Sequence, residues 1–303
     1  KKENQTGVEY MSFPGAYAQG IRLGGSQYNT DHPAHQPGAD GAAPRVKLHE
    51  NAYDCTVAWV SCDRDVNSDE WGKALKVRLA MNHAIDRDAL INNLAFGDGV
   101  PQYISFFTGH TARLKEFGMD KMVREYDPAL ARTLLKEAGY EGGFDLPVTL
   151  TPAFLPGAPE AGEAVSNMWE AVGINPVIER LPYSTFRPKV LNRSHKSAWF
   201  WNNTASISPF QSYSFLFGSA NFLNIGFEHP DFQALMETAR VTYDVEKQWP
   251  ILADMGKFIY DNVLHIPLFE QSSVWPIGPE LGRWDPMAQE LSLLSRWQDA
   301  PHR

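Results

Sequence analysis

The most strongly patterned stretch of the chain runs from Lys76 to Gly99 and predicts two helices. Apolar residues recur in it near helical spacing, and polar residues take the positions between them. These apolar residues are Val77, Leu79, Ala80, Ala84 and Ile85. Asp86 interrupts the pattern and can cap a second helix, Arg87 to Leu94, by accepting hydrogen bonds from its first amides. Gly97 and Gly99 then end that helix.

The rest of the chain alternates between strand and helix patterns. Short apolar or alternating runs between turn residues predict strands, and longer runs with helical spacing predict helices. The expected strands are residues 7–13, 53–60, 144–150, 174–181, 196–201 and 265–269, and the expected helices are residues 128–138, 160–172, 185–191, 209–217, 230–242 and 245–263. Because the two patterns alternate from residue 127 to 218, we predict an α/β fold with helices packed on a sheet.

Composition allows a substantial core and narrows the possible partners. The chain has 303 residues, is 43% hydrophobic and carries a formal net charge of −9. No run approaches the roughly 20 apolar residues that a membrane-spanning helix needs. An acidic chain without a Lys/Arg cluster does not suit nucleic acid or an anionic membrane surface as its main partner. We therefore expect a globular, soluble protein that is neither membrane-embedded nor a nucleic-acid binder.

The chain contains two cysteines, Cys55 and Cys62. Six residues lie between them, which is too many for a CxxC redox motif, and two cysteines are too few for a zinc site. Two interpretations stay open. The pair can form a local disulfide, which suits an oxidising compartment, or both residues can be buried thiols.

Isolated residues give weak indications of other chemistry. His32 and His35, with His49 nearby, could bind a metal, but no paired carboxylates accompany them, and solvated loop histidines are the better interpretation. Gly24-Gly25-Ser26 lacks the second flanking glycine of a nucleophile elbow. No P-loop, GxGxxG or HExxH motif occurs. We expect no cofactor and no metal site.

Several motifs resemble those of the family 5 extracellular solute-binding proteins, the peptide, nickel and oligosaccharide receptors of ABC importers. VRLA at residues 77–80 followed by AIDR at residues 84–87 resembles the family's helix signature. Tyr126-Asp127-Pro128 with LLKEAGY at residues 134–140 is similar to the next helix. Further on, SAWFWNN, Ser208-Pro209, SFLFGS, FEHPDF and LHIPLFE follow the family's order. The resemblance covers most of residues 76 to 275.

This resemblance implies a periplasmic-binding-protein-like second lobe, with a mixed sheet flanked by helices and with hinge strands. We expect residues 1–70 to lead out of a partly missing first lobe, residues 71–265 to form the second lobe, and residues 266–303 to return to the first. The chain starts without a signal peptide. Either that peptide was removed or part of the parent chain is absent, and we favour absence because only 76 residues precede the signature helix.

The resemblance also places a ligand site at the strand that contains a tryptophan followed by polar residues. Strand alternation puts Trp199 and Trp201 on one face and Phe200 on the other. The predicted site residues are Trp199, Trp201, Asn202, Asn203, Thr204, Arg180 and Tyr183. Rigid indoles supply apolar area, and the neighbouring amides donate and accept hydrogen bonds. In the alternative interpretation both tryptophans are ordinary core residues and Arg180 is a surface charge.

One residue departs from the family pattern. Peptide-binding members carry an Asp just after this tryptophan, where it pairs with the α-ammonium of the ligand, and Thr204 stands at about that position here. Without the carboxylate, a buried peptide amine would lose a charge-assisted hydrogen bond. We therefore expect a neutral polyol, a sugar or an aromatic solute rather than a peptide.

Two classes of function follow. The first, implied by the resemblance, is a periplasmic or extracytoplasmic protein that binds a small polar or aromatic solute between two lobes and delivers it to an inner-membrane ABC permease without catalysis. The alternative is a serine-type hydrolase. Its nucleophile would be Ser26, Ser206 or Ser208, and its base would be His195 or His229.

Overall fold

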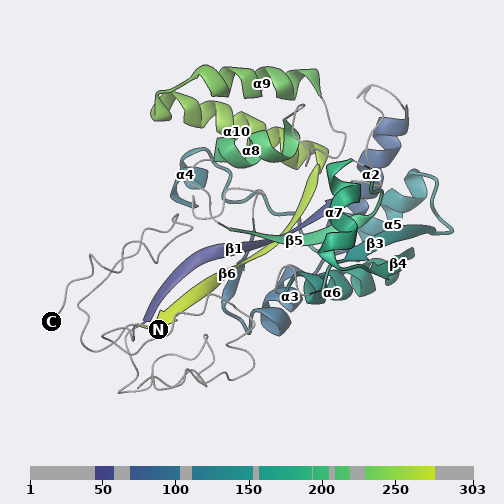
Figure 1. Ribbon diagram of the computed structural model, residues 1–303. Coiled ribbons are helices and arrows are strands. Elements are labelled where there is room, and N and C mark those ends of the chain that lie inside the picture. Colours follow the sequence, from purple (N-terminus) through teal and green to yellow (C-terminus); the bar gives the residue numbers. More distant parts are fainter. Residues whose placement is uncertain are drawn as a thin grey trace.

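The fold is organised around one mixed six-stranded sheet with the strand order β2-β6-β1-β5-β3-β4 (Figure 1). The computed structural model describes residues 45–57, 69–102, 111–152, 157–192, 194–204, 209–218 and 229–276. The strands are β1 (Arg45–Val57), β2 (Gly99–Pro101), β3 (Phe144–Leu150), β4 (Ile174–Arg180), β5 (Ala198–Thr204) and β6 (His265–Pro276). Two expected features, the strand at residues 7–13 and Cys62, fall outside these ranges.

The strand directions divide the sheet into two parts. β3 is parallel to both β4 and β5, whereas β1 is antiparallel to β5 and to β6. β2 pairs with β6, also antiparallel. In the parallel part, α6 connects β3 to β4 and α7 connects β4 to β5, because parallel neighbouring strands need a long crossover connection. The predicted α/β class and the mixed sheet are thus confirmed.

The helices form two groups that pack separately. The described helices are α2 (Asp69–His83), α3 (Arg87–Leu94), α4 (Thr111–Glu116), α5 (Pro128–Glu137), α6 (Ala158–Glu170), α7 (Tyr183–Leu191), α8 (Pro209–Phe217), α9 (Pro230–Val241) and α10 (Val245–Asn262). Residues of α2, α3, α5 and α6 share one hydrophobic cluster with the sheet. Residues of α4, α8, α9 and α10 form another, and α8 to α10 lie together at the top of Figure 1.

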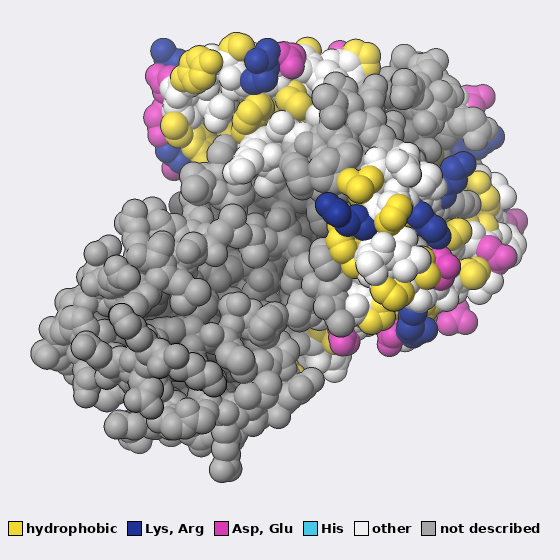
Figure 2. Space-filling view, in the orientation of Figure 1, with side chains coloured by type: hydrophobic (Ala, Val, Ile, Leu, Met, Phe, Trp, Pro, Cys, Tyr) yellow, Lys and Arg dark blue, Asp and Glu magenta, His cyan; other side chains and the backbone are white. Residues whose placement is uncertain are grey.

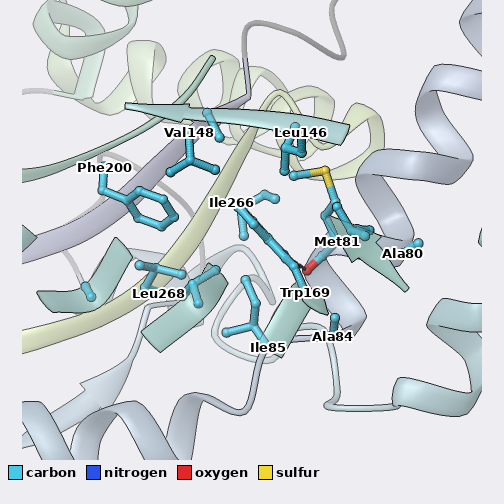
Figure 3. Packing of buried hydrophobic residues seen from close by; sticks show 14 of the residues in the cluster. Ala80, Met81, Ala84, Ile85, Leu146, Val148, Trp169, Phe200, Ile266 and Leu268 are labelled. Carbon is cyan, nitrogen blue, oxygen red and sulfur yellow. Dashed lines mark hydrogen bonds between the residues drawn. The ribbon is translucent and has the colours of Figure 1, made fainter. Parts of the chain in front are cut away.

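The larger cluster centres on Trp169 of α6, whose side chain is fully buried (Figure 3). Its indole Nε1 donates a hydrogen bond of 2.9 Å to the Met81 carbonyl of α2, so one residue satisfies its polar atom while filling the core. Phe200 of β5 and Ile266 of β6 pack in the same cluster. The two parts of the sheet are therefore joined by a common core.

Three arginines connect α2, α3 and the residues before α5 to the end of α10 and to β6. Arg78 Nε donates to the Asn262 carbonyl at 3.0 Å, and Arg124 Nη2 donates to the Tyr260 carbonyl at 2.8 Å. Arg87 donates to the Pro267 carbonyl from both Nε and Nη2, at 3.0 and 2.7 Å. Cations near the C-terminal carbonyls of a helix are favourable, so Arg78 and Arg124 stabilise the end of α10.

Local sequence signals placed several element boundaries correctly. Asp86 caps α3 by accepting from the Ala89 amide, and Asp127 caps α5 by accepting from the Leu130 amide. The strand at residues 144–150 and the helix at residues 209–217 are confirmed in full. The start of α2 was predicted wrongly, since the helix begins at Asp69 and not near Lys76. The last strand was predicted too short, since β6 continues beyond residue 269 to Pro276. Among the described helices, none is long and apolar enough to span a membrane.

Candidate functional site

The candidate site lies where the parallel strands end. β3, β4 and β5 point the same way, so their carboxyl ends meet at one edge of the sheet, where open α/β sheets usually bind ligands. β5 pairs with β3 only at Ala198 and Trp199. The rest of β5 continues past the end of β3 and pairs with β1 on its other side. The predicted site residues at positions 201–204 belong to this projecting segment.

Trp199 lies inside the lobe, covered by α7. Its side chain is 4% exposed, and it contacts Phe186 with ring centroids 5.1 Å apart. Tyr183 stacks on it at 6.2 Å, with only 16° between the rings. Its indole Nε1 donates to Thr151 Oγ1 at 3.4 Å. This burial agrees with the alternative in which Trp199 is a core residue. Tyr183 is only half-buried and lies nearer the surface than Trp199.

The backbone of the projecting segment has a defined register. Trp201 stands opposite Asp54 of β1, and Asn202 stands opposite Tyr53. Asn203 and Thr204 follow, opposite Ala52 and Asn51. The strand thus runs three residues beyond its expected end at Trp201. The side chains of residues 201–204 fall outside what the structure describes, so the binding role of these residues stays a prediction.

The structure places Arg180 on a different surface from Tyr183. Arg180 Nη2 donates to Glu163 Oε1 of α6 at 2.7 Å, and both side chains are about half exposed. This exposed ion pair contributes little to stability. The arrangement agrees with the alternative in which Arg180 is a surface charge. Of the predicted residues whose side chains are described, Trp199 and Tyr183 come together and Arg180 does not join them.

Hydroxyl groups near the carboxyl end of β3 were not predicted. Thr149 Oγ1 and Ser197 Oγ lie 2.7 Å apart and share a hydrogen bond in the interior. Thr151 follows directly after the end of β3, and its Oγ1 accepts a hydrogen bond from Trp199 Nε1. The signal was present in the alternation of VTLT at residues 148–151, where polar residues take every second position. These hydroxyls fix the junction of β3 and β5 immediately beneath α7.

The two histidines proposed as catalytic bases, His195 and His229, lie in places where they contribute to the packing and capping of the fold. His195 is buried, which lowers the pKa of its imidazole to about 4 and makes it a weak base near neutral pH. His229 Nδ1 accepts the Asp231 amide at 3.1 Å and thereby caps α9. The three candidate nucleophiles, Ser26, Ser206 and Ser208, lie outside the described residues.

The structure describes only part of the residues named in the metal and disulfide hypotheses. Within the described ranges, no group of three or more His, Cys, Asp or Glu residues is arranged to bind a metal ion. His49 and Cys55 lie on β1, opposite Ser272 and Ile266 of β6. His32, His35 and Cys62 are not among the described residues, so both hypotheses stay as the sequence left them.

Comparison with known proteins identifies the family. Residues 28–224 match the model of the bacterial extracellular solute-binding proteins, family 5, middle region. The chain belongs to this family. The match includes α2 to α8 and the strand that carries the candidate site, so the resemblance based on sequence motifs is confirmed.

Individual family members agree with this assignment. Over 215 residues the chain is 24% identical to the heme-binding protein A of Haemophilus influenzae, and over 210 residues it is 25% identical to the dipeptide-binding protein of Escherichia coli. These alignments cover 68% and 65% of this chain but 38% of either relative. The chain therefore spans well under half the length of the curated relatives that it matches.

Solved structures show the same fold. The periplasmic binding protein DppA of Helicobacter pylori, in complex with peptide STSA, superimposes with a TM-score of 0.67 at 19% identity, covering 93% of this chain and 54% of that chain. HbpA2 of Haemophilus parasuis gives a TM-score of 0.67 at 17% identity, covering 84% and 49%. The predicted likeness to periplasmic-binding-protein lobes is thus confirmed.

Proposed function

We propose that this chain is part of an extracytoplasmic receptor that binds a small solute in a cleft between two lobes and passes it to an inner-membrane ABC permease. Family membership carries the proposal, because the matched residues 28–224 include the candidate site. The protein would act in the periplasm or its equivalent, and binding would involve no chemical change of the solute. The described lobe would supply one wall of the cleft.

The projecting part of β5 is the proposed contact surface. It lies at the carboxyl edge of the parallel strands, and its edge facing away from β1 has no neighbouring strand within the described part of the chain beyond Trp199. Backbone amides and carbonyls on such an edge are available to a polar solute. The side chains of Asn202, Asn203 and Thr204 would add donors and acceptors of both kinds.

The chemical class of the solute is proposed separately from the receptor role. The names of the matched relatives include heme-, dipeptide- and glutathione-binding proteins, so membership of the family does not select one solute. Thr204 replaces the carboxylate expected for a peptide's α-ammonium group, which favours a polar or aromatic solute that is not a dipeptide. Trp201 would supply the apolar part of the contact.

A thermal-shift screen tests the proposal directly. A solute that prefers the folded state must raise the melting temperature, so sugars, polyols, organic acids, aromatic compounds and dipeptides are compared at several concentrations. A hit should weaken in Asn203→Ala and remain in Asn167→Ala, which changes an exposed amide on α6. Saturable binding from dipeptides alone would overturn the argument from Thr204, and the absence of any saturable binding would contradict the receptor role.

A further inference from the structure

The helix α7 is attached to the sheet by fewer buried side chains than α6, the helix on the opposite face of the same strands (Figure 1). α7 buries two residues, Phe186 and Val190, whereas α6 buries six. The two residues of α7 belong with Trp199 to a cluster of three buried side chains, which is separate from the two larger clusters. Local opening costs least where few apolar side chains are buried, so α7 should detach more easily than α6.

The backbone of α7 also lacks two common sources of helix stability. Pro182 stands at its N-terminal cap, and no side chain there accepts a hydrogen bond from the first amides. Pro188 lies inside the helix and has no N–H, so a backbone bond to the Ser184 carbonyl is not formed. α5 and α10, in contrast, are capped by the side chains of Asp127 and Asp244. α7 therefore depends on the packing of its buried side chains.

His195 lies within this packing, between α7 and β5. Its side chain is 7% exposed, and its ring meets Phe186 and Trp199 edge-on, with centroids 5.2 and 6.4 Å away. Its Nδ1 has no hydrogen-bond partner within the described part of the chain. A neutral imidazole can leave this nitrogen bare, but a protonated one carries a hydrogen on both nitrogens and a positive charge. Protonation would therefore create a buried donor without an acceptor and weaken the contact of α7 with β5.

The described groups around His195 would not compensate its charge. The titratable groups of α7 are Tyr183, Arg187 and Lys189, β5 has none, and Lys196 precedes β5. Lys189 Nζ lies 3.8 Å from Glu179 Oε2 of β4, so this carboxylate already has a cationic partner. Figure 2 shows Lys and Arg side chains on both sides of α7. Burial lowers the pKa of His195 to about 4, and no carboxylate among the described residues pairs with its ring.

We propose that α7 is an acid-sensitive cover, which opens locally when His195 takes up a proton while the rest of the lobe stays folded. Opening would uncover Trp199 and the hydroxyl pair of Thr149 and Ser197 near the carboxyl ends of the parallel strands. In the open form water would solvate the imidazole, so its pKa would return to about 6.5. Opening therefore becomes more favourable as the pH falls from 6.5 towards 4. Because the inference concerns the attachment of α7, it does not depend on the receptor function.

Hydrogen exchange followed by mass spectrometry tests this inference at pH 7.5, 6 and 4.5. Each measured rate is divided by the rate of an unstructured peptide at the same pH, which leaves the protection due to structure. Between pH 7.5 and 4.5 the amides of α7 should lose protection by about tenfold or more. At pH 4.5 the amides of α6 and α10 should remain about a hundredfold more protected than those of α7. Equal protection of the three helices, or no change in α7, would overturn the inference.

His195→Phe and His83→Gln form a matched pair of variants. The first keeps an aromatic ring under α7 but cannot take up a proton, so the protection of α7 should stay within about threefold from pH 7.5 to 4.5. The second removes a histidine of α2 whose Nδ1 lies 2.8 Å from the Glu125 carbonyl, and it should keep the full acid response. An acid response that survives in His195→Phe, or is lost in His83→Gln, would contradict the role given to His195.

Val190→Ala tests the attachment of α7 without a titratable group. Removing two methyl groups from the small cluster should raise the exchange of α7 about tenfold or more at pH 7.5. The exchange of α6 and α10 should change by less than about threefold, and circular dichroism should stay unchanged. If all three helices lost protection equally, α7 would not open as a separate unit, and the inference would fail whatever the behaviour of His195→Phe.

Discussion

At the scale of single residues, Arg87 shows how this lobe tolerates a buried charge. Its guanidinium donates to the Pro267 carbonyl and, at 2.6 Å, to Asn82 Oδ1. A third contact reaches the Arg124 carbonyl at 3.3 Å. Burial lowers the pKa of Arg87 to about 10, which still leaves it charged at neutral pH. The sequence put Asn82 at a polar position of the helix, but only the fold shows that this residue orients a buried arginine.

Arg87→Met should destabilise the lobe strongly. The variant keeps an unbranched side chain but leaves the Pro267 carbonyl and Asn82 without their donors, at a cost of about 3 kcal/mol in the free energy of unfolding. Urea denaturation at neutral pH measures it. Arg132→Met is the control, because Arg132 donates to the Ala171 carbonyl at the surface, and its loss should cost below about 1 kcal/mol. Equal losses in the two variants would contradict the role given to Arg87.

At the scale of elements, α7 is attached to the sheet through a small aromatic cluster of its own. Phe186, Val190 and Trp199 are its buried members, separate from the two larger clusters. His195 packs edge-on against Phe186, with ring centroids 5.2 Å apart. Its Nδ1 has no hydrogen-bond partner in the described structure. A protonated imidazole would be poorly solvated there, so the attachment of α7 depends on a neutral His195.

The stability of the protein should therefore fall on acidification. His195 has a pKa of about 4 when folded and about 6.5 when unfolded. Between these values the unfolded chain takes up a proton that the folded protein does not, so the free energy of unfolding decreases as the pH drops from 6.5 towards 4. His265, with a pKa lowered to about 3 by burial, acts in the same direction.

His195→Phe isolates the contribution of one histidine. The variant keeps an aromatic ring in the cluster but cannot titrate, so between pH 6.5 and 4.5 it should lose about 2 kcal/mol less than the unchanged protein. Urea midpoints at four pH values give the comparison. At pH 7.5 the two proteins should have similar stability and the same circular dichroism. Parallel pH curves would show that His195 does not control this part of the acid response.

Element boundaries could be predicted where a local interaction sets them. Asp86 and Asp127 each accept a bond from an amide three residues on, and that geometry is encoded within one turn. Burial of a particular aromatic residue is not encoded in this way. The alternation around Trp199 fixes its face of the strand, but whether that face meets α7 or a cleft depends on where the intervening chain packs.

At the scale of the whole molecule, the sheet is completed by strands from opposite ends of the described chain. β1 and β6 pair from Arg45–Pro276 to Thr56–His265, although roughly 200 residues separate them. No pattern in the sequence predicts such a pairing, since each strand shows only its own alternation. The family resemblance gave the order of elements, and the long-range register came from the structure alone.

This topology makes the last described strand essential to the lobe. β6 contributes Ile266, Leu268 and Phe269 to the main core, and its Pro267 carbonyl accepts Arg87. A chain that ends at Asn262 should lose cooperative unfolding in urea, because β1 loses one neighbour and the main core loses four buried side chains, those of Val263, Ile266, Leu268 and Phe269. Val177→Ala, on the opposite edge strand with a half-exposed side chain, should shift the midpoint only slightly. A sharp transition in the truncated chain would show that the core closes without β6.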